Sequence, residues 1–183
     1  MKETGKPGIT AENAVENALL TARSEGRNVR ILFVCLGNIC RSPAAEGMMR
    51  HICRDVPSAK RPELDSAGFY GGHAGELPDR RMRMVASRRG LVLTHRSRRI
   101  HDSDFDYFDL ILGMDDSNIS DLHDMAPTPE AERKIARMSD FAVNFPYADC
   151  VPDPYYDGLD GFENVLNLLE DATTTLKKLI ISE

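Results

Sequence analysis

Apolar and polar residues are arranged along the chain in blocks that suit strands and helices in turn. Two short, nearly continuous apolar runs, 29–34 and 108–114, are typical of strands buried on both faces of a parallel sheet. A third, shorter strand is expected at 63–67. Apolar residues at helical spacing predict helices at 43–55 and from residue 160 onward, and further helices are expected at 79–89, 116–125 and 129–137. This alternation predicts an α/β domain whose parallel strands are joined by right-handed helical crossovers.

Several of these helices carry signals for their ends. Thr128 followed by Pro129 is a typical cap and first helical residue, and Gly90 can end the helix at 79–89. Asp160, with Glu163 three residues later, fits a capping box. These signals set the expected boundaries of the helices.

The first 28 residues are mostly polar. A helix is expected at 10–24, capped by Thr10 and ended by Gly26, but its apolar stripe is modest. We therefore expect residues 1–28 to be an amino-terminal extension on the surface, and residues 29–183 to form one domain.

Composition narrows the possible functions. The chain has 183 residues, 42% of them hydrophobic, which is enough for one full core. Its 29 acidic residues outnumber its 23 basic ones, and this balance argues against binding of nucleic acid or an anionic membrane through overall charge. An anion site must therefore be built locally. No segment resembles a signal peptide or a membrane helix of roughly 20 apolar residues, which favours a cytoplasmic protein with reduced cysteines.

The strongest chemical signal follows the first expected strand, in the segment Cys35-Leu36-Gly37-Asn38-Ile39-Cys40-Arg41-Ser42-Pro43. Ser42 is a suitable N-cap and Pro43 a suitable first helical residue, so the loop leads into a helix amino terminus, which attracts anions. Gly37 and Asn38 tolerate left-handed backbone angles, which lets successive amides point inward around a phosphate.

The same loop contains a nucleophile and a clamp. A helix amino terminus and a neighbouring arginine favour the thiolate form of Cys35. The planar guanidinium of Arg41 can hold two phosphate oxygens through the transition state. A small buried cysteine at a strand end is the simpler interpretation of Cys35, but the loop, the clamp and the strand context together favour the nucleophile.

Transfer of a phosphoryl group from a phenol also needs an acid to protonate the leaving group. Asp153 lies between Pro152 and Pro154, which restrict the backbone and hold its carboxyl in one place. Alone, this sequence is an ordinary turn signal. Beside the cysteine loop it predicts a general acid.

These residues resemble the low-molecular-weight protein tyrosine phosphatase family from about Arg30 onward. The resemblance rests on two motifs, 34–43 and Asp153-Pro154-Tyr155-Tyr156, with weaker matches at 65–68, 78–79, 95–96 and 114–118. It implies a three-layer α/β/α domain with a central four-stranded parallel sheet and the phosphate-binding loop after the first strand. It also implies hydrolysis of phosphotyrosine through a cysteinyl-phosphate intermediate, without metal or cofactor, and with Asp153 as general base in the second step.

The resemblance assigns further roles around the loop. It implies that Asn38, Ser42, Ser66 and His95 hydrogen-bond to one another and hold the loop in shape, and that Ser42 also bonds to the Cys35 sulfur. A satisfied core or surface histidine is the simpler alternative for His95. The partner implied is a phosphotyrosine-containing protein or peptide, and neither nucleic acid nor a membrane is expected.

The substrate cleft departs from the family pattern. Members usually carry Trp or Tyr at the position that is Gly72 here by a gapless count. Phe69 or Tyr70 could supply this wall from a shifted loop, and Tyr155 is expected to form the opposite wall. Ile39 favours phosphotyrosine, because the related protein-arginine phosphatases tend to carry Thr there.

Two other functions share parts of this pattern. An arsenate reductase of the same fold would pass a disulfide along further cysteines, and this chain has none between Cys53 and Cys150. A phosphate-binding signalling module without turnover could have lost the nucleophile or the acid, whereas both are present. Cys40 could form a reversible disulfide with Cys35, or could be a small buried residue.

Arginines are frequent between the second and third expected strands. Helical spacing spreads them over a solvated face, which is the simpler interpretation; alternatively they attract acidic residues of a phosphoprotein. The cluster consists of Arg80, Arg81, Arg83, Arg88, Arg89, Arg96, Arg98 and Arg99.

Overall fold

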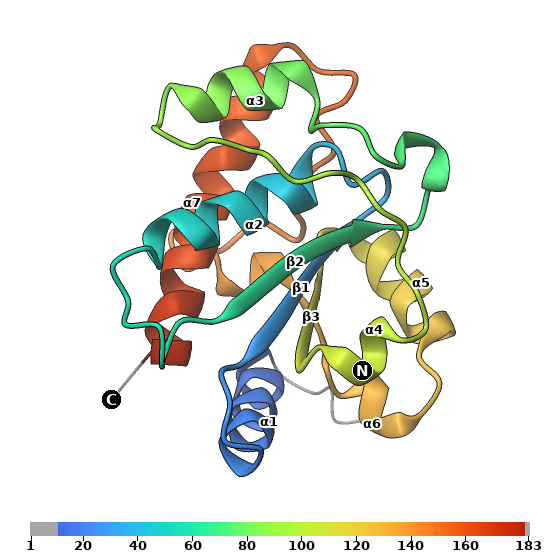
Figure 1. Cartoon of the computed structure of the whole chain (residues 1–183). Coiled ribbons are helices and arrows are strands. Elements are labelled where there is room, and N and C mark those ends of the chain that lie inside the picture. The colour runs from blue at the N-terminus through green and yellow to red at the C-terminus, as the bar shows by residue number, and fades with distance from the viewer. Residues whose placement is uncertain (1–10, 182–183) are drawn as a thin grey trace, which may run out of the picture.

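The computed structural model describes residues 11–181, which form a parallel sheet between two layers of helices (Figure 1). Every strand pairing in the sheet is parallel, and the order is β2-β1-β3-β4. This confirms the three-layer α/β/α class with a four-stranded sheet. The strands are β1 Arg30–Cys35, β2 Glu63–Gly68, β3 Leu110–Gly113 and β4 Ile135–Arg137.

Each face of the sheet has its own layer of helices and its own buried cluster. The first layer contains α2 Arg41–Ile52, α3 Arg80–Ser87 and α7 Leu159–Ile181. The second contains α4 Asp104–Tyr107, α5 Asp116–Met125 and α6 Pro129–Glu132 (Figure 1). Within residues 11–181, no helix is both long and apolar enough to cross a membrane.

Cys35 lies at the point where the order of the strands in the sheet reverses direction. The chain moves from β1 outward to β2 and then returns past β1 to β3. Helices α2 and α5, which follow β1 and β3, therefore leave the sheet on opposite faces. The gap beyond the carboxyl ends of two such strands is the usual ligand site of an open α/β sheet. Cys35 is the last residue of β1 and pairs with Gly68 at this edge.

The fourth strand replaces part of an expected helix. The pattern predicts one helix over 129–137, whereas α6 ends at Glu132 and the chain then extends into β4. The predicted cap is correct, because Thr128 Oγ accepts the N–H of Ala131 at 3.1 Å. Ile135 and Ala136 are buried and pair with β3, so sheet pairing outweighs the local helical signal there.

The amino-terminal helix is part of the core, which differs from the expected surface appendage. Helix α1, Ala11–Ser24, buries Ala14, Val15, Ala18 and Ala22 in the cluster that also contains residues of β1 and α7. The apolar stripe of this helix is weakly hydrophobic because three of its four buried residues are alanines. Alanine, however, lets a helix pack closely against its neighbours. Gly26 has a φ of 65°, as expected of a residue that ends a helix. The proposed Thr10 cap lies outside the described residues.

A buried ion pair fixes the end of this extension to the sheet. Arg27 donates two hydrogen bonds of 2.7 Å to the carboxylate of Asp109, whose side chain is only 2% exposed. The bond to Asp109 raises the pKa of Arg27. Asp109 also accepts the backbone N–H of Arg30 at 2.8 Å. This pair lies where β1 and β3 begin, at the end of the sheet away from Cys35.

Candidate active site

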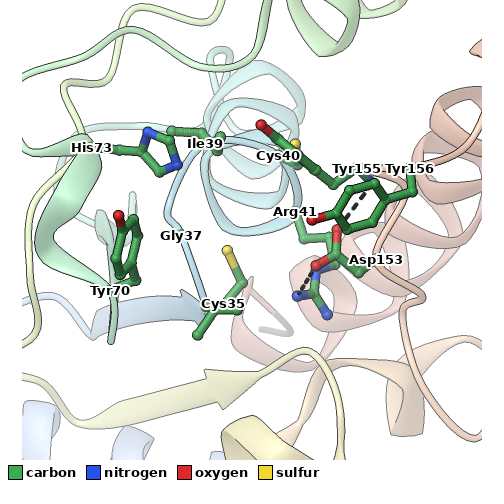
Figure 2. Close-up of a pocket in the computed structure, with 11 residues that line it drawn as sticks. Cys35, Gly37, Ile39, Cys40, Arg41, Tyr70, His73, Asp153, Tyr155 and Tyr156 are labelled. Carbon is green, nitrogen blue, oxygen red and sulfur yellow. Dashed lines mark hydrogen bonds and ion pairs between the residues drawn. The ribbon is translucent and has the colours of Figure 1, made fainter.

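A hollow of about 260 Å³ opens at the carboxyl end of β1 and brings the predicted catalytic residues together. Figure 2 shows Cys35 between Tyr70 on one side and Asp153 and Tyr155 on the other. The predicted residues Leu36, Gly37, Ile39, Cys40 and Arg41 also line it. So do Tyr156, named from the sequence only as part of its motif, and His73, which the sequence did not single out.

The loop after Cys35 enters α2 earlier than expected. The helix begins at Arg41, and Cys40 occupies the N-cap position without a side-chain hydrogen bond. Ser42 is therefore inside the helix, and its predicted capping role is wrong. Asn38 has a φ of 54°, which confirms the left-handed conformation expected of it, whereas Gly37 does not have a positive φ. The bend of the loop is thus concentrated at Asn38.

The hydroxyl of Ser42 connects the sulfur to the loop. Its oxygen lies 3.1 Å from the sulfur of Cys35 and accepts a 2.8 Å hydrogen bond from the side-chain amide of Asn38. The same amide donates to Ser66 Oγ at 3.0 Å. All four residues are buried. Asn38 therefore lies between Ser42, which contacts the sulfur, and Ser66 of β2. These two hydrogen bonds hold its side chain, and with it the left-handed backbone at this residue.

His95 lies on the other side of Asn38. Asn38 Oδ1 accepts the backbone N–H of Arg98 at 2.9 Å, so this oxygen is an acceptor and His95 Nε2, also at 2.9 Å, donates to it. His95 Nδ1 faces the carboxylates of Glu46 at 3.1 Å and Asp65 at 3.5 Å. The predicted contacts of Asn38, Ser42, Ser66 and His95 are all present in this arrangement.

Glu46 completes the network and was missed by the sequence reasoning. Its carboxylate accepts the hydroxyl of Ser66 at 2.7 Å and pairs with Arg50 at 2.8 Å, and its side chain is 8% exposed. Glu46 directly follows Ala45 and so lies beside the apolar stripe of the 43–55 helix, where a charged residue is ordinary; local spacing gave no signal for it. Glu46, Asp65 and His95 are close enough to ligate one cation. Their carboxylates are already bonded to Ser66, Arg50 and Arg98, which supports a hydrogen-bonding role.

Arg41 is buried between two carboxylates. Nη1 donates to Asp115 at 2.5 Å and Nη2 donates to Asp153 at 3.2 Å, while its side chain is only 3% exposed. Burial alone would lower the pKa of Arg41, but the negative charges of Cys35, Asp115 and Asp153 outweigh burial and leave the pKa raised. Asp115 was not among the predicted site residues; it also caps α5 by accepting the N–H of Asn118.

Backbone contacts hold Asp153 at the cleft. The N–H of Val151 donates to the carbonyl of Met114 at 2.8 Å, which attaches this loop to the end of β3. The N–H of Tyr155 donates to the second oxygen of Asp153 at 3.1 Å. The Asp153 side chain remains 47% exposed. Its carboxyl is thus positioned by the loop and open to the cleft.

Tyr70 forms the cleft wall that the sequence left uncertain. A Cβ at Gly72 would overlap the ring of Tyr70, so the glycine leaves the space that this ring occupies. Tyr70 packs edge-on against His73 with ring centroids 5.4 Å apart, and His73 Nδ1 lies 2.8 Å from Glu76. Phe69, the other candidate for this wall, packs instead against the buried cluster on the opposite face of the sheet.

Tyr155 lines the other side, as expected. The guanidinium of Arg81 lies 5.4 Å from its ring centroid and 4.6 Å from that of Phe162. Arg81 is in turn held by the carboxylate of Asp79, which caps α3. Tyr156 packs edge-on against Tyr155 and is 96% exposed. The aromatic ring of a substrate could therefore enter between tyrosines on both sides.

The two cysteines of the loop differ in their surroundings. Both are buried and neither is in a disulfide. Burial, followed by the negative charge of Asp79, raises the pKa of the Cys40 thiol. Cys35 instead lies beside the Ser42 hydroxyl and close to the charged Arg41. The geometry therefore favours Cys35 over Cys40 as the nucleophile.

Taken as chemistry, the site holds a sulfur, an anion clamp, a carboxyl and two aromatic walls around one hollow. A helix amino terminus and Arg41 suit a phosphate oxygen. The half-exposed carboxyl of Asp153 lines the same hollow and can exchange a proton with a leaving group. This combination supports displacement at phosphorus by Cys35.

Comparison with known proteins gives one consistent result. A family model described as low molecular weight phosphotyrosine protein phosphatase matches residues 30–183. The low molecular weight protein-tyrosine-phosphatase of Streptomyces coelicolor is 42% identical over 149 residues, 80% of this chain and 90% of that protein. The low molecular weight phosphotyrosine protein phosphatase of Homo sapiens is 37% identical over 138 residues, 74% of this chain and 85% of that protein.

Solved structures agree with this. The crystal structure of a protein tyrosine phosphatase from Entamoeba histolytica matches with a TM-score of 0.77 at 42% identity, covering 81% of this chain and 94% of that one. The crystal structure of a Drosophila arginine phosphatase matches with a TM-score of 0.76 at 30% identity, covering 84% of this chain and 98% of that one.

Proposed function

The chain belongs to the low molecular weight phosphotyrosine protein phosphatase family, and we propose that Cys35, Arg41 and Asp153 carry out its reaction. The protein is a protein-tyrosine phosphatase, a hydrolase that acts on phosphotyrosine. The observation that best supports the assignment of residues is the position of Cys35 and Asp153 on the same hollow, with Arg41 bonded to Asp153.

In the first step the thiolate of Cys35 attacks phosphorus, and the bond between phosphorus and the tyrosine oxygen breaks. The carboxyl of Asp153 gives its proton to that oxygen, so tyrosine leaves as a neutral phenol. Arg41 stays bonded to Asp115 and exchanges its contact with Asp153 for phosphate oxygens. This exchange frees the Asp153 carboxyl to face the leaving group.

In the second step water attacks the phosphorus of the cysteinyl phosphate. The Asp153 carboxylate takes a proton from that water, the sulfur–phosphorus bond breaks, and inorganic phosphate leaves. Cys35 departs as a thiolate, and a hydrogen bond from Ser42 at 3.1 Å stabilises its charge.

The cleft favours an aryl phosphate. Tyr70 and Tyr155 lie on its two sides and suit stacking against a tyrosine ring. Ile39, which is 8% exposed and lines the hollow, adds an aliphatic surface where the related arginine phosphatases tend to carry Thr. Phosphotyrosine in a protein or peptide is therefore the proposed substrate, and phosphoarginine is the less suited one.

A cytoplasmic location is part of the proposal. All four cysteines are free, and the nucleophile must remain reduced to react, which suits a reducing compartment. The proposed reaction uses only side chains of this chain and water, so it requires neither a metal nor a cofactor.

Steady-state hydrolysis of phosphotyrosine, phosphoserine and phosphoarginine peptides by the reduced wild type and by Cys35→Ser tests the proposal. We expect release of phosphate from phosphotyrosine alone, and none by the variant. Binding of the phosphotyrosine peptide without phosphate release would instead indicate a signalling module, and arsenite production from arsenate with a thiol reductant would indicate a reductase.

A further inference from the structure

A second hollow lies next to the catalytic cleft. It has a volume of about 330 Å³ and is lined by Phe69, Arg99, Ile100, His101, Asp102 and Met125. Three of these side chains are apolar and two can carry positive charge. None of the six lines the catalytic hollow.

One segment of backbone separates the two hollows. The N–H of Phe69 donates to the carbonyl of Cys35 at 3.3 Å, and the N–H of Tyr70 donates to that of Leu36 at 2.8 Å. Tyr70 lines the catalytic cleft and Phe69 lines the second hollow. Phe69 packs against the buried cluster on the second face of the sheet, whereas Tyr70 faces the catalytic hollow, which explains this division. Because Phe69 and Tyr70 are consecutive residues, the linings of the two hollows meet at this segment.

Two arginines near this segment lack an acidic partner. Among residues 11–181, neither Arg96 nor Arg99 has a carboxylate within ion-pair distance, whereas Arg81, Arg89 and Arg98 each pair with at least one. Both unpaired side chains are exposed. They are therefore available to a ligand in a chain whose formal net charge is −6.

Both arginines also lie against the loop that carries the Tyr70 wall. Arg96 donates to the carbonyl of Gly75 at 3.2 Å. The Cδ of Arg99 would lie 3.7 Å from a Cβ placed on Gly71. His73, between these two contacts, lines the catalytic cleft. The unpaired charges of Arg96 and Arg99 thus lie at the edge of the catalytic cleft, and Arg99 also lines the second hollow.

We propose that the second hollow is a substrate subsite, which receives an apolar side chain close in sequence to the phosphotyrosine, while Arg96 and Arg99 bind an acidic residue beside it. Asp102 also lines the hollow and would repel an acid placed inside it, which is why the acidic residue is assigned to the two arginines. This subsite rests on the proposed function, since it selects among phosphotyrosine peptides that the catalytic site then cleaves.

The experiment compares kcat/KM for four phosphotyrosine peptides. Each peptide carries either Asp or Asn at one flanking position and either Leu or Ser at another. The two positions are varied on both sides of the phosphotyrosine. The variants are Arg99→Glu and Met125→Gln. Arg23→Glu on α1 is the matched control, because it makes the same change of charge on an exposed arginine of the helix that packs at the other end of the sheet. Phenyl phosphate is the substrate that does not reach the subsite.

We expect the wild type to prefer the peptide with both Asp and Leu. Arg99→Glu should lower kcat/KM for the Asp peptides about tenfold, which corresponds to about 1.4 kcal/mol, through KM. Met125→Gln should reduce the preference for Leu over Ser. Neither variant should change hydrolysis of phenyl phosphate.

Equal losses on Asp and Asn peptides, or the same loss with Arg23→Glu, would contradict the subsite. So would a Leu preference that Met125→Gln leaves intact. If the wild type cleaves neither the peptides nor phenyl phosphate, the proposed function fails, and this outcome is distinct from failure of the subsite.

Discussion

The sulfur of Cys35 lies 3.1 Å from the hydroxyl oxygen of Ser42, inside the first turn of α2. Asn38 donates to that oxygen at 2.8 Å, which orients the hydroxyl hydrogen away from Asn38. The hydrogen can then point to the sulfur or to the carbonyl of Ala67 at 3.3 Å. A negative sulfur is the stronger acceptor, so this contact strengthens whenever Cys35 is a thiolate.

Ser42→Ala should therefore slow the step in which the sulfur leaves phosphorus. Loss of one hydrogen bond to a charged group costs about 1.5–3 kcal/mol, so we expect kcat to fall roughly 10- to 150-fold. KM should fall with it, because slowing only the second step leaves kcat/KM unchanged. Rapid-quench kinetics should show a larger burst of phenol, because the second step becomes slower than the first. Ser139→Ala is the control, since Ser139 is also largely buried and bonds to the carbonyl of Asp149 at 3.1 Å. An unchanged kcat in Ser42→Ala would show that the contact does not act in turnover.

Asp153→Ala should affect substrates according to their leaving groups. We expect kcat for phenyl phosphate to fall by about 10²–10⁴-fold, because phenolate then leaves without a proton. Aryl phosphates with acidic phenols need little protonation, so the first step with them should be nearly unaffected. The measurement is the dependence of single-turnover rate on the phenol's acidity in wild type and variant. An equal loss for every leaving group would remove Asp153 from the role of acid.

Glu46→Gln should weaken both the fold and the turnover. The variant keeps the shape of the side chain but removes the charge that faces His95 at 3.1 Å. Leaving a buried hydrogen-bonding group without its charged partner costs about 1–3 kcal/mol. We expect the free energy of unfolding, measured with denaturant, to fall by that amount. Because His95 holds Asn38, kcat should fall as well. Glu16→Gln, on an exposed position of α1, should change neither quantity. If Glu46→Gln has normal stability and normal kcat, Glu46 does not support the phosphate-binding loop through His95.

Arg27→Ala should test whether the amino-terminal helix is part of the domain. Removal of Arg27 leaves the buried carboxylate of Asp109 without its partner, which should lower the free energy of unfolding by about 3 kcal/mol. The kcat of the folded protein should not change, because the pair lies at the other end of the sheet from Cys35. Arg23→Ala removes an exposed arginine of α1 itself and should cost less than about 0.5 kcal/mol. If Arg27→Ala and Arg23→Ala have the same free energy of unfolding, the amino-terminal segment does not stabilise the domain and is a surface appendage.

The cysteine loop could be predicted from the sequence because its chemistry is local. A nucleophile, an arginine and a helix start within a few residues are visible as one segment, as Cys35 and Arg41 are. Asp153 is distant in the sequence but carries its own signal in the two prolines that flank it. The structure brings all three to one hollow.

Glu46 and Asp115 were missed for the opposite reason. Each acts through a residue from another element: Glu46 through Ser66 and His95, and Asp115 through Arg41. Their sequence neighbours give an ordinary helical face and an ordinary N-cap. Long-range contacts such as these cannot be read from local spacing.

The errors in the fold have a related cause. Local signals predicted a helix through Ile135, but pairing with β3 provides its hydrogen bonds and burial. Ser42 has the side chain of a good N-cap, yet the sulfur and Asn38 use its hydroxyl instead. In both cases a tertiary contact overrides a correct local preference.

The most direct test of the account is to find where phosphate is held during turnover. Asp153→Ala should be mixed with an aryl phosphate whose phenol is acidic, so that the first step proceeds while the second lacks its base, and then quenched for mass spectrometry. We predict phosphate on the peptide that contains Cys35, bonded to that sulfur, and none after Cys35→Ser. Phosphate on another side chain, or turnover by fully reduced Cys35→Ser within about 10⁴-fold of the wild-type rate, would contradict it.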